Sequence, residues 1–344
     1  MFPLSVLDLV PIRRGDTAGQ ALANALDLAQ QVERFGYRRY WVAEHHNMVG
    51  IASAATSVVV GWLAGGTQTI RVGSGGIMLP NHSPLVIAEQ FGTLASLYPG
   101  RIDLGLGRAP GTDQLTWRAM RRDPMAAEQF PEDVLELREL LGPLQPEQRI
   151  RAVPGYGTEV PLWILGSSLY GAQVAAHFGL PYAFASHFAP AALDQALAVY
   201  RQHFRPSAQL DRPWAMAAVN VVAADSDDEA RHLFTSHQQR VTDMLRNARA
   251  TLAPPIDDIN QYWSPAERAH AQRMLECSIV GSPEAVAEGL QRFIDRTGAD
   301  EVIVNGMIYD HGARVRSFEI LAQAACAVEG PQRARADSPS RVAA

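Results

Sequence analysis

Short runs rich in β-branched and aromatic residues alternate along the chain with segments whose apolar residues recur every three to four positions. The first pair shows the pattern. Residues 3–10 (PLSVLDLV) predict a strand, and residues 17–36 (TAGQALANALDLAQQVERFG) predict a helix that stops at Gly36. The pattern predicts further strands at residues 37–46, 69–79, 101–107, 161–168, 181–188, 213–224 and 299–306. It predicts further helices at residues 51–66, 83–100, 169–179, 282–298 and 316–328.

Eight strands, nearly all followed by helices, in a chain of 344 residues indicate an α/β fold of the (β/α)8 TIM-barrel type. Two segments interrupt the alternation. An insertion at residues 108–159 follows the fourth strand, and a long helical segment at residues 226–275 follows the seventh. A doubly wound parallel sheet is the alternative. We expect one barrel domain over residues 1–328 and a disordered tail, rich in Pro, Ser, Ala and Arg, over residues 329–344.

Composition narrows the choice of partner and chemistry. The net charge of −6 argues against nucleic acid, because phosphate contacts need clustered basic residues. All 30 basic residues are arginine, which excludes a Schiff-base lysine and a Walker lysine. The longest apolar stretch, residues 51–66, is too short and too rich in small residues to span a bilayer. We expect neither nucleic acid nor a membrane as a partner.

The two cysteines and the N-terminus favour a cytoplasmic protein. Cys277 and Cys326 lie far apart in the sequence and form no metal-binding or redox motif. The first fifteen residues lack the basic start of a signal peptide and are interrupted by Pro3 and Asp8.

Active sites of (β/α)8 barrels lie at the C-terminal ends of the strands, and two groups there are suited to phosphate. Gly166, Ser167 and Ser168 stand where the fifth strand turns into a helix, so backbone N–H groups and hydroxyls can meet an anion there. Arg108 follows the fourth strand and can bind a phosphate with two hydrogen bonds. Each alone is more often a helix cap or an ion pair. Together, on adjacent strands, they favour a phosphate-bearing ligand.

Glu44, His45 and His46 end the second predicted strand. Successive strand residues point to opposite faces, so Glu44 and His46 share a face and His45 points away. One ion could then not take both histidines, and no spacing rule recruits His82 or His187, so we expect no metal. An acid–base role for one histidine is favoured, because imidazole titrates near neutral pH. A polar pair at the barrel rim remains the alternative.

Gly75 and Gly76 lie on a central strand, which glycine weakens. Such a pair marks either a close approach of a ligand or a β-bulge, and the sequence leaves both open.

Four stretches of the chain together carry a resemblance to a known family: residues 41–47 (WVAEHHN), 71–114, 161–188 and 280–306. They resemble the bacterial luciferase-like flavin monooxygenase family, in particular its single-chain, FMN-dependent oxidoreductase branch. The similarity extends from Pro3 to about Val328 and is most specific over residues 71–114. It implies a (β/α)8 barrel that binds FMN, commonly as a homodimer.

The resemblance assigns roles to the residues singled out above. His45 matches the family's catalytic histidine, with Glu44 or His46 orienting it. The family's non-proline cis peptide maps to Gly75–Gly76. Arg108 matches the phosphate-binding arginine, and the phosphate loop maps to Ser167 and Ser168. Gly166, which precedes them in the same turn, is a further candidate for cofactor binding.

The implied activity is that of a monooxygenase acting on paired donors: reduced FMN from a separate reductase, O2, and a small organic substrate. Light emission is not implied, because Gly107 replaces the reactive cysteine of the luciferase catalytic subunit and Ser167 replaces an acidic residue. Three alternatives differ in chemistry. They are a deazaflavin (F420)-dependent oxidoreductase, a flavin-binding relative without catalysis, and a metal-dependent barrel hydrolase.

Overall fold

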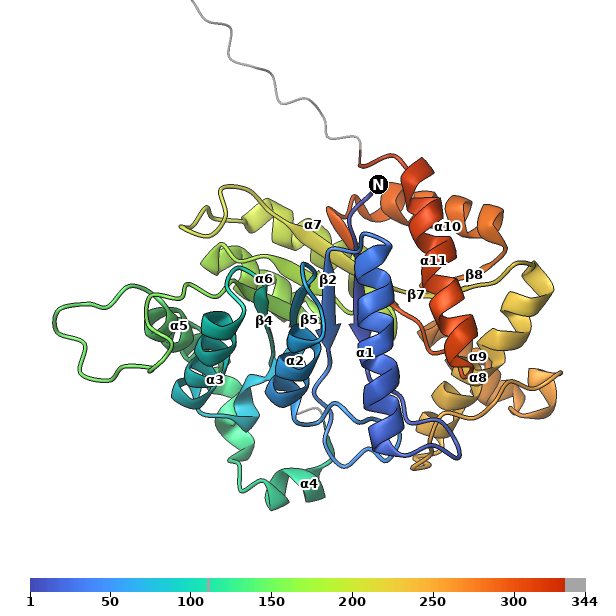
Figure 1. Ribbon diagram of the computed structural model, residues 1–344, viewed down its shortest axis with the longest axis horizontal. Coiled ribbons are helices and arrows are strands. Elements are labelled where there is room, and N and C mark those ends of the chain that lie inside the picture. The colour runs from blue at the N-terminus through green and yellow to red at the C-terminus, as the bar shows by residue number, and fades with distance from the viewer. Residues whose placement is uncertain (110–111, 332–344) are drawn as a thin grey trace, which may run out of the picture.

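The computed structural model describes residues 1–109 and 112–331, and its centre is a closed parallel β-barrel surrounded by helices (Figure 1). The barrel closes because β6 pairs with β7 and β1 pairs with β9. Its eight strands are β1 (Leu4–Asp8), β2 (Arg39–Val42), β3 (Arg71–Met78), β4 (Ile102–Gly107), β5 (Leu162–Gly166), β6 (Tyr182–Phe184), β7 (Ala215–Ala223) and β9 (Glu301–Asn305). The predicted (β/α)8 fold is confirmed, and closure excludes the doubly wound sheet.

Helices cover the outside of the barrel and extend its loops. They are α1 (Ala18–Arg34), α2 (Thr56–Gly65), α3 (Pro84–Leu97), α4 (Gln114–Ala119), α5 (Phe130–Leu141), α6 (Leu169–Phe178), α7 (Leu193–His203), α8 (Asp227–Leu245), α9 (Pro265–Met274), α10 (Pro283–Thr297) and α11 (His311–Ala327). Short 3-10 turns lie at Leu79–Asn81, Pro124–Gln129, Pro190–Ala192 and Ile259–Gln261. None of the helices among the described residues is long and apolar enough to cross a membrane.

The structure differs from the sequence-based expectations in four places. An additional strand, β8 (Ser278–Gly281), pairs with the end of β7 outside the closed barrel. The helix α7 between β6 and β7 was not predicted. The region predicted as one long helical segment is two helices, α8 and α9, joined by an irregular stretch. The second strand ends at Val42, four residues earlier than expected, so Glu44, His45 and His46 lie in the following loop.

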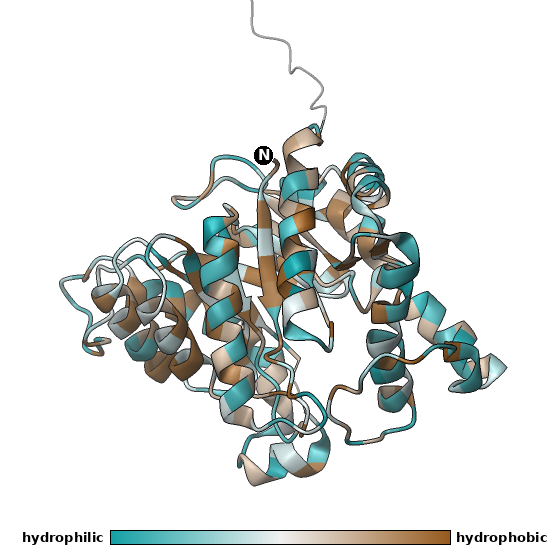
Figure 2. Cartoon of the chain, turned by 45° about the vertical axis from the view of Figure 1, so that its right-hand side comes forward, coloured by the Kyte–Doolittle hydropathy of each residue, from teal (hydrophilic) through white to brown (hydrophobic). Residues whose placement is uncertain are grey.

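Helix α1 shows why these segments fold as they do. Thr17 and Gln20 form a capping box at its start, and Gly36, with a φ of 85°, follows its last turn. Its buried residues recur at helical spacing and face the sheet: Ala21, Ala25, Leu28, Ala29 and Val32. In Figure 2 the central strands are mainly brown, whereas the outer helices alternate between brown and teal along their length.

The barrel interior is filled in layers, which leaves open space at one end only. At the N-terminal ends of the strands, Arg39 donates to Asp103 and Glu301 over 2.8 Å each. Above this ionic layer, Trp41 and Trp163 pack edge to face with ring centroids 5.1 Å apart. These two filled layers close the bottom of the barrel, so a ligand can enter only from the C-terminal ends.

Candidate active site

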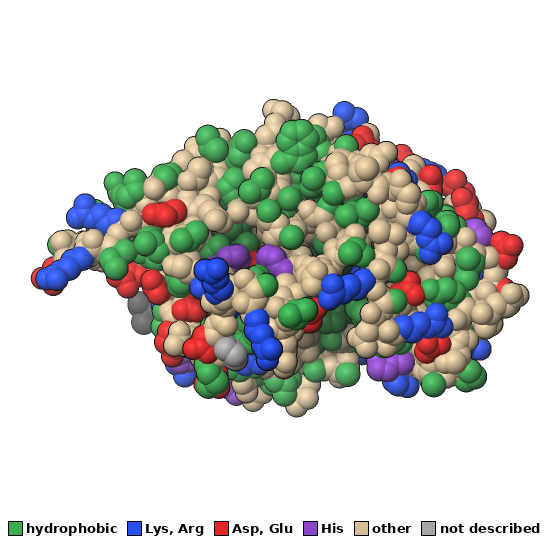
Figure 3. Space-filling model, turned by 90° about the horizontal axis from the view of Figure 1, so that it is seen from below, with side chains coloured by type: hydrophobic (Ala, Val, Ile, Leu, Met, Phe, Trp, Pro, Cys, Tyr) green, Lys and Arg blue, Asp and Glu red, His purple; other side chains and the backbone are tan. Residues whose placement is uncertain are grey.

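A cavity of about 510 Å3 opens at the C-terminal ends of the barrel strands. Figure 3 looks onto this end of the molecule, where histidine side chains lie beside a hollow bordered by apolar side chains and arginines. The residues that line the cavity come from β1 to β7, from β9, from α5, α6, α8 and α9, and from the loops between them. The volume lies within the range of small-molecule and cofactor sites.

One part of the cavity wall is made by the groups expected to bind phosphate. Arg108, Gly166, Ser167 and Ser168 all line the cavity. The Arg108 guanidinium lies over the Tyr170 ring, 4.1 Å from its centroid, and has no ion pair among residues 1–109 and 112–331. Ser168 is the N-cap of α6, but its side chain makes no capping hydrogen bond. The first N–H groups of α6 are thus available to an anion beside a guanidinium.

The glycine pair of β3 lies on the same wall. The Gly75–Gly76 peptide is cis, and the pairing of β3 with β4 shifts register between Ser74 and Ile77. A Cβ atom on Gly76 would lie 2.7 Å from the Gly105 carbonyl oxygen, and one on Gly75 would lie 2.6 Å from Leu7 Cδ1. Both glycines line the cavity, so they serve the close packing of β3 as well as the cavity surface.

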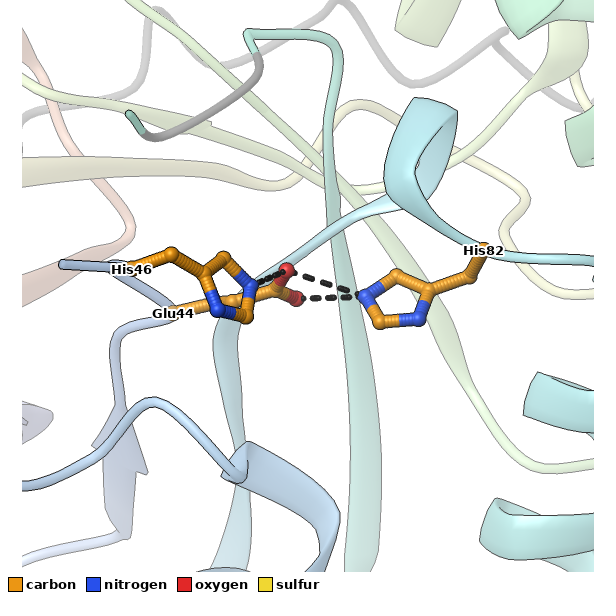
Figure 4. A group of neighbouring side chains, drawn as sticks. All are labelled: Glu44, His46 and His82. Carbon is orange, nitrogen blue, oxygen red and sulfur yellow. Dashed lines mark hydrogen bonds and ion pairs between the residues drawn. The ribbon is translucent and has the colours of Figure 1, made fainter. Parts of the chain in front are cut away.

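Glu44 does not line the cavity; it is the buried centre of a hydrogen-bonded cluster (Figure 4). Its carboxylate accepts hydrogen bonds from His46 Nε2 at 2.7 Å, His82 Nε2 at 2.9 Å, Met78 N at 3.0 Å and Asn81 Nδ2 at 3.1 Å. Burial alone would raise the pKa of Glu44, but these donors lower it to about 2. The hydrogen bond between His46 and the Glu44 carboxylate raises the pKa of His46. Glu44 therefore fixes the loop that carries His45.

His45 points away from that cluster and lines the cavity. Its Nδ1 atom is buried and has no hydrogen-bond partner among the described residues. Burial lowers the pKa of His45 to about 4, although the charge on Glu44 opposes this shift. No hydrogen bond joins His45 to Glu44 or His46 in the part of the chain that the structure describes, and the orienting role of these two residues stays a prediction. As expected, the two histidines point in different directions: His45 lines the cavity, whereas His46 is hydrogen-bonded to Glu44.

Several cavity residues were missed by the sequence analysis. His187 and His237 are buried imidazoles whose Nδ1 atoms have no partner among the described residues. Burial lowers the pKa of His187 to about 3 and that of His237 to about 4, so both are neutral at pH 7. Arg240 on α8 also lines the cavity. His187 lies near the C-terminal end of the strand predicted at residues 181–188, which was a usable signal. His237 and Arg240 lie in the segment predicted as helical, which gave no such signal.

The cluster in Figure 4 bears on the question of a metal. Ligand atoms of Glu44, His46 and His82 all lie within 4.8 Å of one another, so the fold adds His82, which the sequence spacing did not connect, to Glu44 and His46. Both Nε2 atoms already lie at hydrogen-bond distance from the Glu44 carboxylate. The absence of a metal stays a prediction, which a metal analysis of the purified protein would check.

Glu44→Gln is expected to lower the free energy of unfolding by about 2–4 kcal/mol, because every group around the carboxylate is a donor and the new amide NH2 would face them. Urea denaturation would measure the change. The matched control is Glu288→Gln, at an exposed ion pair with Arg292, which should change stability little. An unchanged midpoint for Glu44→Gln would show that the cluster does not stabilise the loop.

Comparison of the amino-acid sequence with known protein families assigns the chain to a family. Residues 2–301 match the family model described as luciferase-like monooxygenase. The chain belongs to the luciferase-like monooxygenase family. An Escherichia coli (strain K12) protein described as luciferase-like monooxygenase is 56% identical over 317 residues, which cover 92% of this chain and 95% of that relative. The N-acetyl-S-alkylcysteine monooxygenase of Bacillus subtilis (strain 168) is 31% identical over 96% of this chain and its own whole length.

Solved structures agree with this membership. The crystal structure of apo-MsnO8 superposes with a TM-score of 0.87 at 34% identity, covering 94% of this chain and 98% of that one. The oxygenating constituent of 3,6-diketocamphane monooxygenase from Pseudomonas putida, solved in complex with FMN, has a TM-score of 0.74 at 17% identity over 97% and 100% of the two chains. An F420-dependent secondary alcohol dehydrogenase has a TM-score of 0.67 at 14% identity over 94% and 99%. The last two show a shared fold alone.

Proposed function

We propose that the protein is an FMN-dependent monooxygenase that uses reduced FMN and O2 to oxygenate a small organic substrate. The observation that supports it most is one cavity lined both by Arg108 and the start of α6, which are suited to bind a phosphate, and by the buried, neutral imidazole of His45. Family membership supports an oxidoreductase of the monooxygenase type.

The residues present fit a flavin mononucleotide. Arg108 would hold the phosphate together with Ser167, Ser168 and the first N–H groups of α6. Gly75 and Gly76 present only backbone to the cavity, which suits a flat ring system at close approach. Among the described residues, no Asp or Glu side chain lines the cavity, so no carboxylate of that lining opposes the phosphate.

When bound in reduced form, the flavin would supply the electrons that activate O2. The protein would contribute two things. The apolar lining, which includes Leu7, Met48 and Val241, keeps water from the reacting atoms. His45 would take up or release a proton through a ring nitrogen, with Glu44 acting on it only as a nearby charge.

The remaining partners follow from this proposal. Reduced FMN would come from a separate flavin reductase, so the protein alone should not oxidise a nicotinamide cofactor. We place the protein in the cytoplasm, where its free cysteines, Cys277 and Cys326, would stay reduced.

We further propose a homodimer formed through α2 and α3. Val58 and Trp62 on α2 are 71% and 54% exposed, and Val86 and Leu97 on α3 are 45% and 64% exposed. Exposed apolar groups gathered on neighbouring helices are typical of interfaces.

Trp62→Glu is expected to convert the dimer into a monomer, because a desolvated carboxylate would be buried in the interface. Light scattering after size exclusion would report a mass near 37.5 kDa for the variant and twice that for the wild type. Ile150→Glu, at a position 62% exposed outside α2 and α3, is the control and should stay dimeric. A monomeric wild type would refute the dimer.

The choice of cofactor is tested by anaerobic titration with reduced FMN and, separately, with reduced deazaflavin. We expect tight binding of FMN and weak binding of the deazaflavin. Preferential binding of the deazaflavin would replace the monooxygenase with a hydride-transfer enzyme on the same fold. Binding of reduced FMN without oxygenation of any organic compound, and without a slower return of the oxidised flavin than in free solution, would leave a flavin-binding protein.

A further inference from the structure

One face of α8 lines the cavity on the side away from the phosphate wall. His237, Arg240, Val241 and Met244 recur at the spacing of a single helix face, and all four line the cavity. Helix α8 follows β7, which lies three strands from β4 around the barrel. Arg240 and Arg108 therefore approach the same space from different sides.

Arg240 carries a charge with no direct partner in the described part of the chain. It has no hydrogen bond or ion pair among residues 1–109 and 112–331, and burial lowers its pKa. Asp243, one turn further along α8, is the acid that acts on it electrostatically, yet the Asp243 carboxylate accepts the hydroxyl of Tyr262. A partly buried guanidinium without a carboxylate partner costs free energy, which an anionic ligand would recover.

The surroundings of Arg240 fit an anion with an apolar body. The cavity lining contains no Asp or Glu from residues 1–109 and 112–331. The side chains of His187 and His237 are buried and line the cavity, and each has an Nδ1 atom with no partner in the described part of the chain. A neutral imidazole can donate a hydrogen bond to an anion. Val241, Met244 and Met307 supply apolar surface beside these polar groups.

We propose that Arg240, with His237 beside it, is the binding site for the anionic group of the substrate, a carboxylate on an apolar chain. This inference rests on the proposed function, because it assumes that the flavin phosphate binds Arg108 and that the substrate and the flavin occupy the same cavity. The cavity would then hold two anions, one at each arginine, and His45 lines the same cavity from the loop after β2.

The test uses octanoate and 1-octanol as probes, because they differ only in the head group. Calorimetric titration would be done on the full-length protein with and without FMN. The wild type should bind octanoate more tightly than octanol. Arg240→Gln should lower the affinity for octanoate by about 10- to 100-fold, which is the usual contribution of a charge-assisted hydrogen bond, and should leave the affinity for octanol unchanged. Arg240→Lys should retain part of the preference for octanoate.

Arg108→Gln is the matched control and should lose affinity for FMN while binding octanoate as the wild type does. Two outcomes would overturn the proposal: equal affinity of the wild type for octanoate and octanol, or weaker FMN binding by Arg240→Gln with octanoate unaffected. The second would assign Arg240 to the flavin. Failure of the proposed function gives a different result, since FMN would not bind while the preference for octanoate in flavin-free protein would persist.

Discussion

His45→Ala should reduce the rate of substrate oxygenation by about 10²- to 10⁴-fold, the contribution of a positioned acid–base group, and leave FMN affinity near that of the wild type. The expectation rests on position. His45 lines the cavity, and its buried Nδ1 atom has no partner among the described residues, whereas Arg108 and Ser168, proposed to bind the phosphate, follow β4 and β5. The assay follows oxygenation of the first organic compound that the wild type is shown to convert, with reduced FMN supplied by a reductase.

His46→Ala is the matched control, because this adjacent imidazole is bonded to Glu44 and does not line the cavity. His46→Ala should lower the free energy of unfolding and change the rate of oxygenation little. Equal losses from the two changes would make the histidines a structural unit. Full activity of His45→Ala would assign proton transfer to another group.

The pH dependence adds a second readout for His45. Burial lowers the pKa of His45 to about 4, so its imidazole stays neutral as the pH falls from 8 to 6. Protonation of this group should therefore not reduce the rate in that interval. A loss of activity in the wild type, centred near the ordinary imidazole pKa of about 6.5 and absent from His45→Gln, would show that burial does not hold the ring neutral.

Arg108→Ala should lower the affinity for FMN by about 10- to 100-fold and hardly change the affinity for riboflavin, because the guanidinium acts on the phosphate that riboflavin lacks. Arg108 has no competing ion pair among the described residues, so its charge is available to the ligand. Quenching of flavin fluorescence would give both dissociation constants.

Ser168→Ala provides the comparison at the other side of the phosphate. Its hydroxyl makes no capping hydrogen bond, but the N–H groups at the start of α6 would remain, so the loss of FMN affinity should be smaller. Equal weakening of FMN and riboflavin by Arg108→Ala would move that arginine out of the phosphate site.

The fold could be predicted because the barrel elements carry strong local signals. Strand and helix alternation, with Gly36 after the first helix, indicates the (β/α)8 class without any tertiary information. What was missed had weaker or unused signals. β8 has only four residues. α7 carries a helical pattern of buried positions at Leu193, Ala196, Leu197 and Tyr200, which the sequence analysis overlooked.

The site could be predicted only in part, for a physical reason. Arg108 and Ser168 follow neighbouring strands, so the barrel rule brings them together. His82 joins Glu44 across β2 and β3, and His237 with Arg240 reaches the cavity from a helix. Those contacts depend on how loops and α8 fold over the barrel mouth, which no spacing along the chain specifies. The alternation argument divided His45 from His46 as the structure does, although β2 ends before both.

The most direct test of the proposed function is the reaction of protein-bound reduced FMN with oxygen. Anaerobic protein loaded with reduced FMN is mixed rapidly with air-saturated buffer, and the return of oxidised-flavin absorbance is followed. We predict that this return is much slower than for free reduced FMN, because the apolar cavity shields the reacting atoms from water, and slower than for Arg108→Ala, which releases the flavin. A return at the rate of free reduced FMN, with the flavin shown to be bound, would contradict a monooxygenase.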